Sequence, residues 1–374
     1  MKILATHPCL DRYGSDRMFL RSASGLSQRG CDVTVVTARA GELDEEAVSL
    51  GIAPLSCDTA ILQKAYLNPI GLLGFFLRWQ RAVRAHCTVI RRERPDVIYV
   101  NTVTLPAWIT AGWLCRIPVV CHVHEAERGV PLIIQWALRA PLMLCNSIIA
   151  NSDSTAAWLG RSKRLRSRSA VVYNGFVEPN AALPARSADG SAVLVGRLSP
   201  RKGQDIAIEA IAILHEKGRE VVLRLVGDVF EGYEWFESEL RDLAERRGVA
   251  HLICFEGYSA EVSSFIDAAS VALVPSRTEP FGNVAVEALA RACPVVVSGV
   301  DGLKEIVTDR VTGLVIAVGD PASLAAAILR ILDDAPFAAT LASQGRSAML
   351  DRFGADRFAA EIYDVVSRAA RRAI

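Results

Sequence analysis

Hydrophobic residues along the chain form short continuous runs that alternate with longer stretches in which apolar positions recur every three or four residues. Short runs bounded by turn residues are typical of buried strands, and the longer pattern is typical of helices. Regular alternation of the two predicts parallel sheets made of strand–helix–strand units. The expected strands cover residues 2–5, 32–37, 97–100, 119–122, 147–151, 192–195, 221–226, 252–255, 271–274, 295–297 and 314–317, and the clearest helices cover residues 205–217, 235–247, 283–292 and 322–332.

The alternation is interrupted between residues 178 and 190, where proline, alanine, serine and glycine predominate. This composition is typical of a linker, and 374 residues are too many for one ordinary hydrophobic core. We therefore predict an α/β protein of two doubly wound, Rossmann-like domains, residues 1–178 and 179–352, with a terminal helix over residues 353–374 that can pack back on the first domain. Ligands of doubly wound sheets bind at the carboxyl ends of the strands, so the two domains are expected to face each other across a cleft.

Composition and charge narrow the class of protein. A net charge of +1 argues against a nucleic-acid-binding protein that relies on bulk charge. The nine cysteines are scattered, odd in number and never spaced as Cys-x-x-Cys, so neither a disulfide framework nor a zinc site is indicated and a reducing cytoplasm fits. The longest apolar stretch, residues 130–150, is interrupted by Gln135, Arg139 and Pro141, and a central arginine alone costs about 3 kcal/mol on insertion scales. We predict a cytoplasmic protein without a transmembrane helix.

The richest candidate chemistry lies in residues 275–287, between an expected buried strand and an expected helix. We predict that Glu279 lies on the rim of the site and that Glu287 is buried beneath it, because the helix around Glu287 is apolar on nearly every side. A buried carboxylate needs hydrogen-bond donors, which sugar hydroxyls can supply. The backbone N–H groups at the helix start have no partner within the helix and can attract a phosphate. These groups belong to Phe281, Gly282 and Asn283. The alternative is that Glu287 pairs with a core arginine and Glu279 is a surface acid.

A second group of charged residues follows the expected strand 192–195. Gly196 lets the chain leave that strand in a tight turn, and Arg197 and Lys202 can both reach a ligand above the strand end, as two cations suited to a diphosphate. The alternative is an ordinary solvated basic loop. Since this loop and residues 275–287 follow strands of one expected sheet, we expect both at its carboxyl edge.

Nine short motifs follow one another in a characteristic order. Those of the C-terminal half are Gly196-Arg197…Lys202-Gly203, Val226-Gly227-Asp228, Phe255-Glu256-Gly257, Pro275-Ser276…Glu279-Pro280-Phe281-Gly282…Glu287-Ala288 and Gly302…Glu305-Ile306-Val307…Gly313-Leu314-Val315. Those of the N-terminal half are Tyr13-Gly14-Ser15, His124-Glu125, Asn151-Ser152 and Asn174-Gly175. Together they closely resemble the motifs of the retaining glycosyltransferases of family 4, which have the GT-B fold. The resemblance is highly specific over about residues 192–330 and looser before them.

The resemblance implies a role for each candidate residue. Arg197 and Lys202 would bind the donor diphosphate, Glu279 the transferred sugar and Glu287 the ribose diol. His124 would lie near the transferred sugar. The other positions implied to bind the nucleotide sugar are Gly14, Ser15, Gly196, Phe281, Gly282 and Asn283.

The chain departs from the family pattern at two positions. Ser15 stands where a second glycine is common, and His122 doubles the histidine, so the choice of His124 rests on the adjacent Glu125. For each histidine, the alternative is an imidazole that is simply satisfied within the core.

The implied activity is transfer of a sugar, with retention, from a UDP- or GDP-linked donor to a glycan acceptor in cell-surface polysaccharide or glycolipid synthesis. No Asp-x-Asp metal motif occurs in the chain, so we expect no metal or other cofactor; two cations and a helix N-terminus can stabilise the leaving phosphate. Three alternatives share the fold: a nucleotide-sugar epimerase, a hydrolase, and a non-catalytic subunit that binds sugar nucleotides.

The acceptor is less well defined by the sequence. Residues 69–79 are rich in leucine, phenylalanine and tryptophan and are followed by five arginines before residue 95, a combination typical of an interfacial helix on an anionic bilayer. Its expected apolar face is Leu72, Phe75, Phe76 and Trp79, and a second basic loop covers residues 161–168. The alternative is a helix packed on the sheet with a basic outer side. A lipid-linked glycan at the inner face of the membrane is thus a candidate acceptor.

Overall fold

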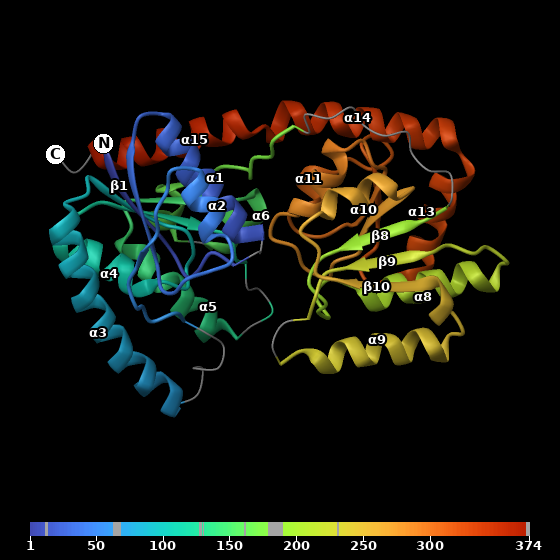
Figure 1. Ribbon diagram of the computed structural model, residues 1–374, viewed down its shortest axis with the longest axis horizontal. Helices are drawn as coiled ribbons and strands as arrows, with labels where there is room; N and C mark the ends of the chain where they lie inside the picture. The colour runs from blue at the N-terminus through green and yellow to red at the C-terminus, as the bar shows by residue number, and fades with distance from the viewer. Residues whose placement is uncertain are drawn as a thin grey trace. The chain divides into compact units, whose positions relative to one another are not determined.

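The computed structural model describes residues 1–11, 14–62, 69–126, 129, 131–160, 162–178, 190–229 and 232–371, with the backbone alone for residues 69–73 and Ile133. The chain forms two compact units (Figure 1). Unit 1 contains Met1–Gly175 and Ala355–Ile374, and unit 2 contains Phe176–Gly354. Tyr13, the side chain of Leu72, Arg161 and nearly all of the expected linker 178–190 lie outside the described residues.

Unit 1 is built on a sheet of seven strands in the order β3-β2-β1-β4-β5-β6-β7, and every pairing is parallel. The strands are β1 (Lys2–His7), β2 (Asp32–Thr37), β3 (Leu55–Ser56), β4 (Val97–Val100), β5 (Val119–Val123), β6 (Ser147–Ala150) and β7 (Ser169–Val171). The two-residue strand β3 has no apolar run of its own, and the hydrophobic pattern does not predict it.

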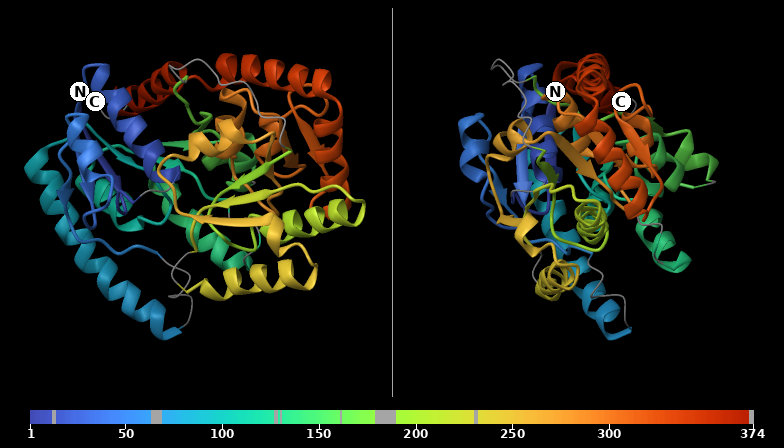
Figure 2. Two further views of the ribbon diagram at one scale, coloured as in Figure 1. Left: turned by 45° about the vertical axis from the view of Figure 1, so that its right-hand side comes forward. Right: turned by 90° about the vertical axis from the view of Figure 1, so that its right-hand side faces the viewer.

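Helices cover both faces of this sheet (Figures 1 and 2). One core holds α1 (Gly14–Gln28), α2 (Asp44–Ser49) and α15 (Ala355–Arg371). The other holds α3 (Pro69–Glu93), α4 (Pro106–Cys115), the 3-10 helix η2 (Ala140–Leu144), α6 (Asp153–Trp158) and α7 (Lys163–Arg166), with α5 (Leu132–Arg139) packed against η2. The expected terminal helix 353–374 is wrong at its start, because Gly354 is extended and separates Phe353 from α15.

Unit 2 has a parallel sheet of six strands in the order β10-β9-β8-β11-β12-β13. The strands are β8 (Ala192–Val195), β9 (Leu223–Val226), β10 (Ile253–Gly257), β11 (Val271–Val274), β12 (Val295–Ser298) and β13 (Leu314–Ile316). The helices are α8 (Gln204–Glu216), α9 (Glu234–Arg246), the 3-10 helix η3 (Ala250–Leu252), α10 (Val262–Ala268), α11 (Asn283–Ala290), α12 (Leu303–Ile306), α13 (Pro321–Asp333) and α14 (Ala335–Phe353). The prediction of two doubly wound parallel sheets is confirmed.

Both sheets reverse their strand order beside their first strand. In unit 1, β1 lies between β2 and β4, and in unit 2, β8 lies between β9 and β11. Loops leave such a switch point in opposite directions, which opens a crevice for ligands at the carboxyl ends of the strands. The ends of β1, β4, β8 and β11 are therefore the places at which the fold supports binding.

Two further expectations concern the chemistry of the chain. All nine cysteines are free thiols, as their spacing predicts. Among the helices that the structure describes, none is both long enough and apolar enough to span a membrane.

Candidate functional site

The loops after β8 and β11 meet at the switch point of unit 2. Gly203 permits this close approach: its φ is +77°, and a β-carbon there would lie 2.3 Å from the carbonyl oxygen of Pro275. The Arg277 backbone N–H also donates to the carbonyl of Arg201 at 2.8 Å. The two charged loops therefore share one edge of the sheet, as their strands predict.

The centre of this site is an ion pair between Lys202 and Glu279. Lys202 Nζ lies 2.6 Å from Glu279 Oε2, and the Ser276 hydroxyl donates to the same oxygen at 3.1 Å. The aliphatic part of Lys202 runs over Gly196, which has no side chain in its path. The sequence placed these two residues at one edge but did not predict that they pair, and it missed Ser276.

The expected depths of the two glutamates are wrong. Glu279 is buried, with 9% of its surface exposed, whereas Glu287, in the second turn of α11, is only partly buried. The cause lies after β12, where Asp301 Oδ2 accepts hydrogen bonds from Thr278 Oγ1 at 3.0 Å and from the Glu279 N–H at 3.2 Å. The Gly302 N–H donates to the Glu279 carbonyl at 3.1 Å. These contacts hold the loop folded down against the sheet edge.

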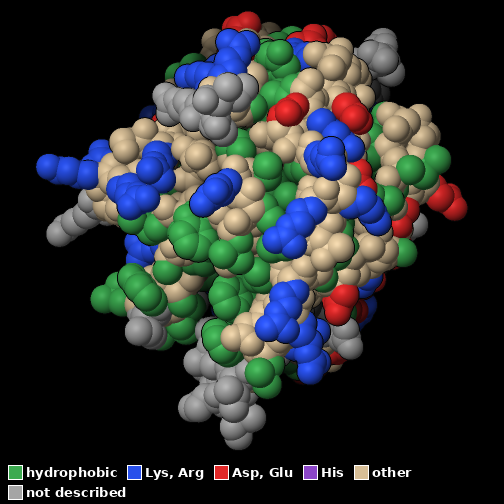
Figure 3. Space-filling view, turned by 90° about the vertical axis from the view of Figure 1, so that its left-hand side faces the viewer, with side chains coloured by type: hydrophobic (Ala, Val, Ile, Leu, Met, Phe, Trp, Pro, Cys, Tyr) green, Lys and Arg blue, Asp and Glu red, His purple; other side chains and the backbone are tan. Residues whose placement is uncertain are grey.

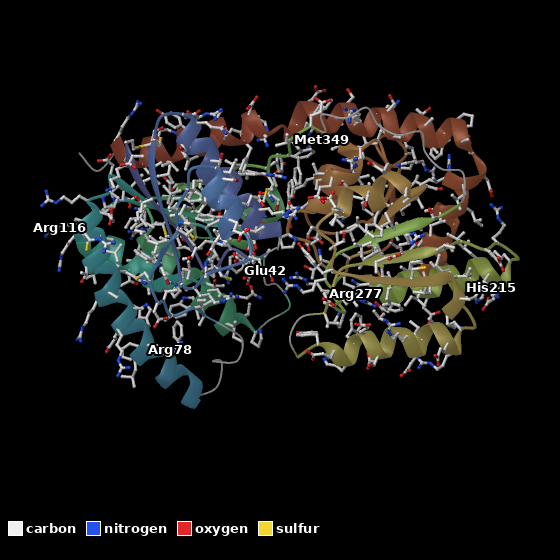
Figure 4. The ribbon with its side chains drawn as sticks, in the orientation of Figure 1. Glu42, Arg78, Arg116, His215, Arg277 and Met349 are labelled. Atoms are coloured by element: carbon white, nitrogen blue, oxygen red, sulfur yellow. The ribbon has the colours of Figure 1, made fainter. Side chains whose placement is uncertain are left out.

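A second ion pair ties the two loops to helix α8. The Arg277 guanidinium forms a bidentate pair with Asp205, with N–O distances of 2.8 and 2.5 Å, and also donates to the Pro200 carbonyl. Arg277 is labelled in Figure 4. Such a fork fixes two loops more firmly than a single contact does. No local pattern predicts this pair, because its members are 72 residues apart.

The N-terminus of α11 completes this edge of unit 2. Gly282 is the N-cap residue with φ +122°, and a β-carbon there would lie 2.5 Å from Leu303 Cδ2. Phe281 is buried and Asn283 begins the helix. Arg197 follows β8, and its carbonyl accepts from Gln204 Nε2 at 3.0 Å, which fixes the backbone of the basic loop. The edge thus combines cations with a helix N-terminus, a combination that suits an anionic ligand.

Unit 1 presents a hydrogen-bonded chain of side chains at its own switch point. His7, at the end of β1, lies 2.8 Å from Asp16 Oδ1 through Nε2 and 3.2 Å from Asn101 Nδ2 through Nδ1. Asn101 follows β4, and its Oδ1 lies 3.0 Å from His124 Nε2. A carboxylate only accepts, so His7 donates from Nε2 and accepts at Nδ1 from the Asn101 amide. The Asn101 oxygen then accepts from His124 Nε2–H, which leaves Nδ1 of His124 as an acceptor.

The two neighbouring histidines after and within β5 differ in their surroundings. His122 is fully buried, with its Nδ1 2.6 Å from the Tyr99 hydroxyl, whereas His124 is partly exposed at the strand end. Burial lowers the pKa of His124 to about 3 and lowers the pKa of His122 well below its usual value. Both imidazoles are therefore neutral at physiological pH. His122 is a core residue whose Nε2 has no hydrogen-bond partner among the described residues, and His124 lies at the carboxyl edge of the sheet.

The remaining expected residues of unit 1 lie close by. Gly14 and Ser15 open helix α1, and the Ser15 hydroxyl donates to Asp16 Oδ1 at 2.9 Å. Glu125 accepts from the Thr102 hydroxyl and from the His124 N–H, and burial raises the pKa of Glu125. Glu125 thus holds the backbone of His124 in place.

One group in the described part of the chain could hold a metal ion. It consists of His215, Glu220 and His251, whose ligand atoms lie within 4.8 Å of one another. These residues precede β9 and β10, at the amino edge of the sheet, and the Lys202–Glu279 pair lies at the carboxyl edge. The group is therefore separate from the candidate site.

Comparison with known proteins accounts for both halves of the chain. The model described as "Glycosyltransferase Family 4" matches residues 13–177, and that described as "Glycosyl transferases group 1" matches residues 181–348. An uncharacterized glycosyltransferase of Methanocaldococcus jannaschii is 32% identical over 278 residues, which cover 67% of this chain and 70% of the relative. The D-inositol 3-phosphate glycosyltransferase of Thermobispora bispora is 26% identical over 97% of this chain and 91% of its own length.

Solved structures agree on the fold. HepE of Anabaena in complex with UDP-glucose matches with a TM-score of 0.83 and 23% identity, over 98% of this chain and 100% of that one. Sucrose-phosphate synthase of Thermosynechococcus elongatus matches with a TM-score of 0.76 and 21% identity, over 98% of both chains. The chain therefore belongs to glycosyltransferase family 4 and has the GT-B fold, with one doubly wound sheet in each of its two units.

Proposed function

We propose that this glycosyltransferase uses a nucleoside diphosphate sugar as donor and transfers the sugar to a glycan with retention and without a metal ion. The observation that carries the proposal is the Lys202–Glu279 pair, held at 2.6 Å beside the N-terminus of α11 at the switch point of unit 2. It puts a cation and a carboxylate side by side where the leaving phosphate and the transferred sugar would meet.

The cations serve the leaving group. Cleavage of the anomeric carbon–oxygen bond leaves negative charge on the diphosphate, and preorganised positive groups lower the barrier because they stabilise that developing charge. Lys202 and Arg197 supply two such groups, and the α11 N-terminus adds about half a unit charge. The Arg277–Asp205 fork holds the loop that carries Lys202, so little reorganisation is needed during the reaction.

The carboxylates serve the two sugars of the donor. Glu279 is fixed by Lys202 and Ser276, both through Oε2, and is positioned to accept hydrogen bonds from the transferred sugar. Glu287 is partly open on α11 and is assigned to the ribose diol. His124, neutral and with Nδ1 as acceptor, is assigned to a hydroxyl of the transferred sugar. Retention rests on the family alone.

We infer UDP as the first donor nucleotide to test. HepE, which shares the fold, was solved with UDP, with UDP and glucose, and with UDP-glucose. GDP remains the alternative, since the assigned contacts to ribose and diphosphate do not distinguish the bases.

We propose a glycan acceptor in cell-surface polysaccharide or glycolipid synthesis, at the cytoplasmic side of the membrane. Relatives carry the names D-inositol 3-phosphate glycosyltransferase, 2-deoxystreptamine glucosyltransferase and glycogen synthase, so acceptors in this family range from small polyols to polymers. The five arginines between residues 81 and 94 favour an acceptor that is presented at an anionic membrane.

The test is a screen of UDP- and GDP-linked hexoses for binding by calorimetry and for slow hydrolysis by the purified protein. Transfer to a glycan, with the anomeric configuration of the product followed by NMR, would support the proposal. Conversion of the donor into an epimer in the absence of acceptor would indicate an epimerase, and binding without any turnover would indicate a non-catalytic subunit. Failure of every nucleotide sugar to bind would refute the donor assignment.

A further inference from the structure

One helical layer of unit 1 has an outer surface with many exposed apolar side chains. The layer consists of α3, α4, α5, η2 and α7, which adjoin one another on one face of the sheet. Trp113 and Trp136 are 56% and 65% exposed. The large hydrophobic side chains exposed on this layer are Phe76, Leu77, Trp113, Leu114, Leu132 and Trp136. Exposed groups of this size that gather on one layer indicate an interaction surface.

The same layer concentrates positive charge. Its elements contain one acid, Glu93, which is paired with Lys2 and Arg92. They contain nine basic residues, which are Arg78, Arg81, Arg84, Arg91, Arg92, Arg139, Lys163, Arg164 and Arg166. The whole chain has a net charge of only +1, so the rest of the chain is net acidic. Figure 3 looks onto this side of the molecule and shows blue side chains spread among green ones, with red mainly at the margins.

A groove of about 390 Å³ opens within this layer, between the end of α4, η2 and α7. Apolar side chains of Ile117 and Met143 line it, together with Arg116, Arg164 and Arg168. Arg168 is oriented by a 2.9 Å hydrogen bond from Nη1 to the Cys145 carbonyl. A lining that mixes apolar side chains with three guanidinium groups is suited to a phosphate that is attached to a hydrocarbon chain.

We propose that this layer docks on an anionic phospholipid bilayer, with a headgroup phosphate in the arginine groove and Trp113, Leu114 and Trp136 in the interfacial region. Tryptophan favours the headgroup level of a bilayer, and each arginine near an anionic surface adds about fivefold to binding, the equivalent of about 1 kcal/mol. A nucleic acid would complement the arginines but would leave the six exposed apolar side chains unexplained. Membrane docking does not depend on the donor assignment. Only the connection between docking and a lipid-linked acceptor rests on the proposed function.

The surface differs from the face expected from the sequence. Phe75 and Trp79 are partly buried and pack against the core beneath α3, whereas Phe76 and Leu77 are exposed. The helical periodicity of α3 identified an amphipathic helix but assigned part of its core face to the membrane. The tryptophans of α4 and α5 enter the surface only because the fold brings these helices beside one another.

Co-sedimentation of the full chain with vesicles tests the proposal. Vesicles of phosphatidylcholine alone are compared with vesicles that contain about one third phosphatidylglycerol, at low and at high salt. We expect binding to the anionic vesicles, release by salt, and weak binding to the neutral ones. Removal of two charges by Arg116→Gln with Arg164→Gln should weaken binding about 25-fold. Trp113→Ser with Trp136→Ser should weaken it at least tenfold.

Matched controls lie on unit 2. Trp235 is 49% exposed on α9, and Arg246 is exposed at the end of the same helix, so Trp235→Ser and Arg246→Gln should leave vesicle binding unchanged. Equal losses in these controls, or no sedimentation with anionic vesicles at low salt, would overturn the docking surface. Binding to double-stranded DNA but not to vesicles would also overturn it. Nucleotide-sugar binding is measured on the same variants: if it persists while vesicles fail to bind, only the docking proposal fails.

Discussion

The switch points of the two units show how one topology supports two kinds of polar site. In unit 2 the strand ends carry ion pairs, Lys202–Glu279 and Arg277–Asp205, on partly open loops. In unit 1 the corresponding edge carries a series of hydrogen-bonded side chains that runs from Asp16 through the His7 imidazole and the Asn101 amide to His124. Charged groups suit a step in which charge develops on phosphate, whereas neutral acceptors suit the orientation of sugar hydroxyls. The topology sets the position of each polar site, at the carboxyl ends of the strands. The burial of the side chains there determines whether the site is charged or neutral.

The largest effect should follow from breaking the charged edge. Lys202→Ala removes the cation assigned to the diphosphate, and we expect a loss of transition-state stabilisation on the order of 2–4 kcal/mol, measured as the decrease in kcat/KM for transfer. Lys217→Ala is the matched control, since Lys217 is exposed at the opposite end of α8. Thermal unfolding of both variants checks the fold. Near-native turnover in a folded Lys202→Ala variant would rule out the diphosphate assignment.

Acid should destabilise unit 1, because its buried histidines are neutral in the folded state. Burial lowers the pKa of His86 to about 4, below the ordinary histidine value of 6.5, and it also lowers the pKa values of His122 and His124. The unfolded state therefore binds more protons below pH 6.5, and the free energy of unfolding falls as the pH falls. From about pH 7 to about pH 5 the loss is roughly 2 kcal/mol for His86. The raised pKa of Glu125 acts in the opposite direction.

Urea unfolding of the wild type and of His86→Leu at about pH 7 and about pH 5 isolates the contribution of His86 to the pH dependence of the free energy of unfolding. His86 is buried and stacks on Trp108 with ring centroids 3.7 Å apart, so the leucine retains an apolar contact. The variant should lose about 2 kcal/mol less than the wild type over this pH range. An identical pH dependence in the two proteins would show that His86 is not held neutral by burial.

Substitution of Glu287 and of Glu279 should affect different parameters, donor affinity in one case and kcat in the other. Glu287→Gln should weaken nucleoside diphosphate binding by roughly 1 kcal/mol, because a charge-assisted hydrogen bond to ribose becomes a neutral one. Glu279→Gln should mainly lower kcat, because its carboxylate is assigned to the transferred sugar. Calorimetry with UDP and steady-state kinetics measure the two effects. Equal UDP affinity in Glu287→Gln and the wild type would exclude the ribose role.

Much of this architecture could be predicted from the sequence, since buried parallel strands are continuous apolar runs. Asp320 and Pro321 likewise signal the start of α13, where Asp320 Oδ1 accepts from two backbone N–H groups at 3.0 Å. The depth of Glu279 was not predictable, because it is set by Asp301, which lies 22 residues further along the chain. The hydrogen-bonded side chains that run from Asp16 to His124 connect α1 with the ends of three strands. No local sequence pattern links these residues. Periodicity reports which side of an element is buried, and it does not report which loops meet.

The smallest expected effect is that of chelation on transfer. The groups assigned to the leaving phosphate are Arg197, Lys202 and the α11 N-terminus, and these need no divalent ion. EDTA should therefore leave kcat/KM within experimental error. The group formed by His215, Glu220 and His251 lies at the amino edge of the sheet, so a metal bound there would change the thermal unfolding temperature but not turnover. Activity that disappears with EDTA and returns with magnesium or manganese would show that protein cations do not suffice, and the contrast between the charged and neutral switch points would then have to include a metal ion.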